Sequence, residues 1–178
     1  KGKFLIENPN YNNSDKSVNL SLEASEFDRL SGQGYKSNRT GLSTGSKFEY
    51  YDDLFLGISI DNFAEKVTVN SNASSKQKKN AGNFFDSFLV LDFNYDKRNQ
   101  KFATTDGFIS NYSVSLPVYS ETGTLLNSYY FKVFSELYEN NVSTASLLLR
   151  SSFSVNDEDI KLSERLFIPG NRLRGFES

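Results

Sequence analysis

The sequence contains no histidine and no cysteine among its 178 residues. The absence of histidine removes the side chain that most often acts as a general base near neutral pH, and also the commonest metal ligand. The absence of cysteine excludes a disulfide framework, a thiol nucleophile and a thiolate metal site. We therefore expect no catalytic centre, no metal site and no cofactor, and we expect that the protein is not an enzyme.

Long apolar runs are also missing. A transmembrane helix needs about 18 or more consecutive apolar residues, and no such run occurs in this sequence. The mean hydropathy of -0.52 remains compatible with a membrane β-barrel, because barrel strands are apolar on one face only. The net charge of -2 gives no basic surplus, so we expect no nucleic-acid partner.

What the sequence does contain is alternation of apolar and polar residues, which is typical of strands with two different faces. In the stretch 16–26, Val18, Leu20, Leu22 and Ala24 share one face, and polar residues occupy the other. The pattern recurs often enough to predict roughly eight strands. Residues 62–83 are mostly polar, and we expect a long loop there.

The connections between these segments suggest a membrane barrel. Short turns near Asn10, Asp53 and Asn141 alternate with longer stretches, and outer-membrane barrels have short periplasmic turns and longer outer loops. Charges in the middle of strands, such as Lys47 and Asp92, would then point into a wet lumen. A passive porin and a soluble β-sandwich binding protein would show similar alternation, so both remain open at this point.

Two motifs narrow the choice. The last stretch contains Ser163-Glu164-Arg165, a Pro-Gly-Asn turn at 169–171 and Leu173-Arg174-Gly175-Phe176. Earlier, Tyr95-Asp96-Lys97-Arg98-Asn99 is followed by Thr105-Asp106-Gly107. Both motifs resemble signatures of the BamA or bacterial surface antigen family of outer-membrane barrels. This family usually has proline before the threonine of the second motif, whereas here Ala103 and Thr104 precede Thr105.

The resemblance implies an all-β fold: an antiparallel transmembrane β-barrel of about sixteen strands, of which this chain supplies roughly eight. Residues 1–178 would be a fragment of a single outer-membrane β-barrel domain, with residues 156–178 as a signature loop that folds into the lumen. The implied location is the bacterial outer membrane.

The resemblance also implies which residues matter. Arg174 would anchor the loop to a carboxylate or aromatic group of the lumen, Gly175 would let the backbone turn closely, and Phe176 would pack inside. Glu164 and Arg165 would brace the base of the loop. The full set of signature-loop residues is Glu164, Arg165, Gly170, Leu173, Arg174, Gly175 and Phe176. The periplasmic-turn motif comprises Tyr95, Asp96, Arg98, Asn99, Thr105 and Gly107.

The function implied by the resemblance is outer-membrane protein assembly, in which other β-barrel proteins are folded and inserted into the membrane. The expected partners are nascent outer-membrane β-barrel proteins, accessory assembly lipoproteins and outer-membrane lipid. A TamA-like barrel or a two-partner secretion transporter is the alternative within the same superfamily, because these proteins share the motifs.

Overall fold

A computed structural model describes residues 1–31, 34–138, 141–156 and 159–166. Eight antiparallel strands form one sheet in which each strand pairs with the next along the chain. The strands are β1 (Gly2–Asn8), β2 (Lys16–Arg29), β3 (Tyr35–Tyr51), β4 (Leu54–Val69), β5 (Gly82–Asp96), β6 (Gly107–Tyr119), β7 (Thr124–Tyr138) and β8 (Asn141–Ser154). Three short helices accompany them: η1 (Tyr11–Asn13), α1 (Ser75–Lys79) and η2 (Leu162–Glu164). The all-β antiparallel prediction is confirmed.

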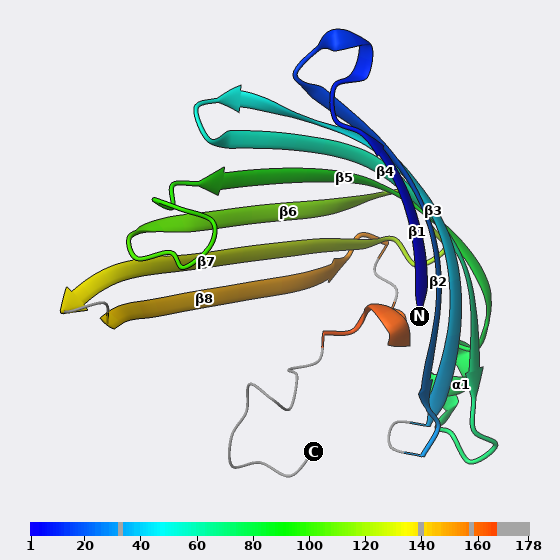
Figure 1. Ribbon diagram of the computed structural model, residues 1–178. Helices are drawn as coiled ribbons and strands as arrows, with labels where there is room; N and C mark the ends of the chain where they lie inside the picture. Colours follow the sequence, from blue (N-terminus) through cyan, green and yellow to red (C-terminus); the bar gives the residue numbers. More distant parts are fainter. Residues whose placement is uncertain (32–33, 139–140, 157–158, 167–178) are drawn as a thin grey trace.

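The sheet is open and strongly curved, and η2 lies on its concave side (Figure 1). Strands β1 and β8 form its two edges. Within the described ranges, no helix is long and apolar enough to cross a membrane.

The predicted alternation gives the sheet two different faces. Ser21, Ser43 and Asp61 lie beside one another across β2, β3 and β4 on the concave, inner face. Leu22 and Leu42 are paired on the outer face, where their side chains are 51% and 43% exposed. Exposed apolar surface costs about 25 cal/mol per Å² in water. A row of such exposed side chains therefore suits contact with hydrocarbon.

The prediction of a loop over residues 62–83 was wrong over much of its length. Strand β4 continues to Val69 and β5 begins at Gly82, so the connection is 70–81. This connection contains α1, whose N-cap Ser74 forms a capping box with Gln77.

The reason for this error is that the alternation of polar inner positions and apolar outer positions breaks down at this end of the strands. The inward side chains of Tyr35 and Val67 are buried, with 5% and 2% exposure. The outward side chain of Lys36 instead forms an ion pair with Glu26 at 2.8 Å. The inward face here therefore combines buried apolar residues such as Val67 with buried charged residues such as Glu65, while charged residues such as Lys36 face outward. Because the two faces no longer differ simply in polarity, the segment looks like a loop in the sequence.

Because every strand is antiparallel to the next, the connections lie at two opposite ends of the strands. The connections 30–34, 70–81 and 120–123 lie at one end, which is also the end where β8 finishes. The connections 9–15, 52–53 and 97–106 lie at the other end (Figure 1). The motif at 95–107 and the segment 159–166 therefore belong to opposite ends of the strands.

Candidate functional site

The segment 159–166 follows β8 and rests against the inner face of the sheet. Leu162 is 4% exposed and packs against Tyr35 and Val67, with Val69 and Phe84 around them. Full burial of a leucine side chain contributes roughly 2 kcal/mol. This small apolar cluster seats the segment on β3, β4 and β5.

A buried ion cluster lies beside this apolar contact. Lys161 is 0% exposed, and its ammonium group donates a hydrogen bond to the Asp86 carboxylate. The Lys161 Nζ atom also lies 3.7 Å from Glu65 Oε2 and 3.6 Å from Glu164 Oε1, and 4.8 Å from the centre of the Phe84 ring. We call Lys161, Glu65, Asp86 and Glu164 the Lys161 cluster.

Two of the three carboxylates have further donors. Glu65 accepts hydrogen bonds from Ser37 Oγ and, at 2.9 Å, from Ser163 Oγ. Asp86 Oδ1 accepts a hydrogen bond from Ser120 Oγ at 2.6 Å. Buried ions that are paired and hydrogen-bonded in this way are tolerated, whereas removal of one partner typically costs about 3–5 kcal/mol. The cluster therefore fixes the segment to the wall.

Glu164 differs from the other two carboxylates. It is 7% exposed, and within the described residues its Oε2 atom has no hydrogen-bond donor. Burial raises the pKa of the Glu164 carboxyl above its ordinary value, and the nearby Lys161 ammonium opposes this shift. The buried Glu164 carboxyl therefore takes up a proton more readily than a free glutamate does.

Arg165 closes the segment on itself, because its Nε atom donates a hydrogen bond to the carbonyl oxygen of Ile160 at 3.2 Å. Glu164 and Arg165 thus both lie where the segment meets the wall. The remaining signature-loop residues, Gly170, Leu173, Arg174, Gly175 and Phe176, lie outside the described residues, and their roles stay predictions.

Sequence reasoning missed the other members of the cluster. Lys161 stands between Ile160 and Leu162, and a charged residue flanked by two apolar ones was the available signal. Glu65 lies in the stretch that we expected to be a loop. Its position beside Asp86 depends on the pairing of β4 with β5, in which Phe63 faces Asp86.

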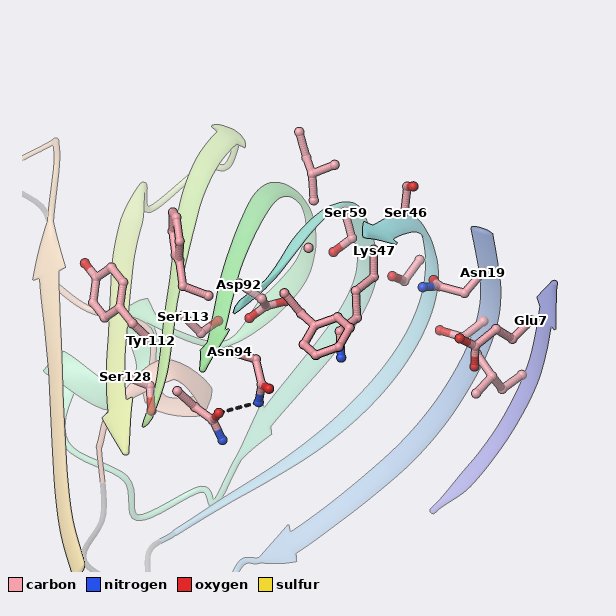
Figure 2. Close-up of a pocket in the computed structure, with 18 of the residues that line it drawn as sticks. Glu7, Asn19, Ser46, Lys47, Ser59, Asp92, Asn94, Tyr112, Ser113 and Ser128 are labelled. Atoms are coloured by element: carbon pink, nitrogen blue, oxygen red, sulfur yellow. Dashed lines mark hydrogen bonds between the residues drawn. The ribbon is translucent and has the colours of Figure 1, made fainter. Parts of the chain in front are cut away.

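Among the described residues, the rest of the inner wall forms an uncovered polar groove of about 490 Å³. Figure 2 shows side chains from β1 to β7 pointing into it, with a hydrogen bond from Asn94 Nδ2 to Asn111 Oδ1. Its charged lining residues are Lys3, Glu7, Lys47 and Asp92. This groove is the wet part of the inner face.

The six residues of the predicted periplasmic-turn motif are brought together between β5 and β6. Arg98 binds Asp96 through two hydrogen bonds, of 2.8 Å from Nε and 2.6 Å from an Nη atom. Asn99 donates to the Thr105 hydroxyl at 2.7 Å and accepts a hydrogen bond from the Thr105 amide at 3.2 Å. The Tyr95 ring packs edge-on against Phe108, with 5.5 Å between the ring centres.

Gly107 ends this turn in a conformation that other residues rarely adopt. Its φ angle is +100°, and a Cβ atom there would lie 2.1 Å from the Lys97 carbonyl oxygen.

Lys97 connects this turn to the neighbouring turn between β3 and β4, because its Nζ atom lies 2.7 Å from Asp53 Oδ2. The hydrogen bond that the Lys97 ammonium donates to Asp53 raises the pKa of Lys97, so this contact holds throughout the neutral range.

Comparisons with known proteins agree with this geometry. A solved structure, BamA from Haemophilus ducreyi lacking POTRA domains 1-3, superposes with a TM-score of 0.69 and 15% identity, covering 85% of this chain. The chain covers 33% of that structure's chain. No curated protein sequence matches. The model of the Omp85 superfamily domain matches residues 1–178, and the chain therefore belongs to the Omp85 superfamily.

Proposed function

We propose that this chain forms part of the barrel wall of an outer-membrane protein assembly factor. Such a factor folds other β-barrel proteins and inserts them into the bacterial outer membrane. Members of the superfamily are outer-membrane proteins, and the chain has the sheet of a BamA-type barrel. The observation that carries the proposal is the docking of segment 159–166 on the inner wall, with Lys161 fully buried among three carboxylates.

This docking supports the role proposed for the signature loop. Because Lys161 and Leu162 hold the segment on the wall, the residues that follow Glu164 and Arg165 start from a defined point on the inner face. An anchor at Arg174 would then act on a loop whose base is already positioned. The work is mechanical, and it needs no bond-making group and no cofactor.

The proposed partners follow from the same role. They are nascent outer-membrane β-barrel proteins, accessory assembly lipoproteins, and the lipid that the exposed apolar outer face contacts. A secretion transporter of the same superfamily would use the same wall to export one substrate rather than to insert many barrels.

The test uses the complete gene in a strain depleted of the chromosomal copy. Arg174→Ala should lower the amounts of many outer-membrane barrels by about tenfold, the effect of losing roughly 1.4 kcal/mol of anchoring. Arg172→Ala, which removes the same charge from the same loop, serves as the matched control and should leave these amounts near normal.

Quantitative mass spectrometry of outer-membrane fractions provides the measurement. Normal barrel amounts with Arg174→Ala would contradict the proposal. Loss of one exported protein, with all barrels at normal levels, would assign the chain to a secretion transporter instead.

A further inference from the structure

A second groove, of about 330 Å³, lies between the docked segment and the wall formed by β6, β7 and β8. Three arginines from different parts of the chain line it: Arg39 of β3, Arg150 of β8 and Arg165 of the segment. Arg39 and Arg165 are half-buried, whereas Arg150 is exposed. We call this space the arginine groove.

Within the described ranges, the arginines of this groove form no close ion pairs, although Arg39 acts electrostatically on the Glu164 carboxyl. Within residues 1–31, 34–138, 141–156 and 159–166, none of the three forms an ion pair with a carboxylate. The Arg39 guanidinium instead stacks on the Phe63 ring, 3.5 Å from its centre, and its buried Nε atom has no acceptor. Glu164 also lines the groove, but its Oε1 atom lies 3.6 Å from Lys161.

Three guanidinium groups around one space create a positive potential that favours an anion. A guanidinium group presents its N–H donors in a planar fork, which matches the two oxygens of a carboxylate. The remaining lining suits a polypeptide, because the hydroxyl-bearing residues Ser113, Ser115 and Ser128 also line the groove. These hydroxyls can donate to and accept from the main chain of a peptide.

We propose that the arginine groove binds a carboxylate carried by an extended polypeptide segment in the lumen of the barrel. Acidic side chains and a chain terminus both supply this group. The inference goes beyond the assembly role, because it concerns the binding of an acidic peptide by the purified protein and needs no assembly reaction.

Lipid phosphate has similar oxyanion chemistry, but its position argues against it. The groove opens on the inner face, which carries the serines and charged residues of the wall. The apolar side chains that suit lipid, such as Leu147 and Leu149 of β8, lie on the opposite face and are 47% and 55% exposed. A lipid headgroup would therefore have to leave the membrane surface to reach the arginines.

The experiment measures fluorescence anisotropy with the complete protein in detergent. The probe is a fluorescein-labelled peptide of serine, threonine and glutamate, and its partner peptide has glutamine in place of every glutamate. We expect the glutamate peptide to bind more tightly. Arg150→Gln should weaken that binding about tenfold, the effect of losing one charge-assisted contact. Arg150→Lys keeps the positive charge but lacks the planar fork of N–H donors. Its affinity for the glutamate peptide should therefore lie between those of the unchanged protein and Arg150→Gln.

Lys132→Gln is the matched control, because Lys132 of β7 lies on the same inner face but outside the arginine groove. It removes the same charge and should change binding by less than about twofold. Heat-dependent gel migration checks that each variant is folded. The Arg150 side chain forms no hydrogen bond within the described part of the chain, so we expect its variants to fold.

Three results would overturn the inference. The glutamate and glutamine peptides could bind equally, Arg150→Gln could match Lys132→Gln, or glycerol phosphate could bind to the groove while the glutamate peptide does not. The last result would identify a lipid-headgroup site. None of these results bears on the assembly role, which is tested by barrel amounts in cells.

Discussion

The middle of the strands and the end beside the β4–β5 connection differ in the polarity of their two faces. Across the middle of the sheet, the inner face carries Ser21 and Asp61, and the outer face carries exposed Leu20. At the end beside the β4–β5 connection, Val67 is buried on the inner face and Lys36 is paired with Glu26 on the outer face.

This contrast shows that the polarity of each face follows what covers it. The inner face is polar where it lines the uncovered groove, and Lys47 and Asp92 can stay hydrated there. Where segment 159–166 covers it, water is displaced, so apolar residues pack and buried charges must be paired. Equivalent substitutions in the covered and uncovered parts should therefore have unequal effects.

The largest effect should come from Lys161→Met, which leaves three buried carboxylates without their cation. Such a loss typically costs about 3–5 kcal/mol. Here it would lower the free energy needed to detach the segment from the wall, and the effect cannot exceed that free energy. Hydrogen exchange of a peptide spanning 159–166 measures this opening, because the Glu164 amide is bonded to the Lys161 carbonyl. Lys47→Met in the uncovered groove should leave exchange unchanged; equal exchange in both variants would refute the contrast.

A smaller effect is expected from Asp86→Asn. This change keeps the shape of the side chain but removes the charge that pairs with Lys161, at a cost of about 1–3 kcal/mol. Asp92→Asn is the matched control, since it makes the same change on the inner face of the same strand, in the uncovered groove. The same exchange measurement should show faster opening for Asp86→Asn only. Faster opening with Asp92→Asn as well would mean that burial is not the deciding factor.

The smallest effect concerns Glu164 and pH. Since its pKa is raised by burial, the docked state favours the protonated carboxyl. Docking should therefore be strongest below the ordinary pKa of glutamate and weaken as pH rises through the raised value. The groups that face Glu164 include Lys161, Asp86 and Arg39. Glu164→Gln should reduce this pH dependence of exchange, and an unchanged pH profile would show that other groups cause it.

Much of the fold could be predicted from the sequence. The alternation of Val18, Leu20 and Leu22 indicates a strand with an apolar outer face. Such alternation predicts a strand correctly wherever one face of the sheet meets water and the other does not. The prediction failed after Asn62, because the inward face there is covered by a segment about 100 residues further along the chain. Sequence patterns within one strand carry no information about such a distant covering.

The candidate site was predictable only in part. Glu164 and Arg165 were identified because they match a family motif, but Lys161 belongs to no motif and its partners lie on β4 and β5. Pairing of Glu65 and Asp86 with Lys161 depends on strand register and on the path of the segment after β8. Neither can be deduced from the local sequence.

The most direct test of the central claim is a double-mutant cycle between Lys161→Met and Asp86→Asn, measured by hydrogen exchange of segment 159–166 in the complete protein. If a buried ion pair holds the segment, the double variant should lose about 0.5–3 kcal/mol less than the sum of the two single losses. Losses that add within about 0.3 kcal/mol would mean that the two residues act independently. That result would contradict the account of a segment fixed to the wall through Lys161.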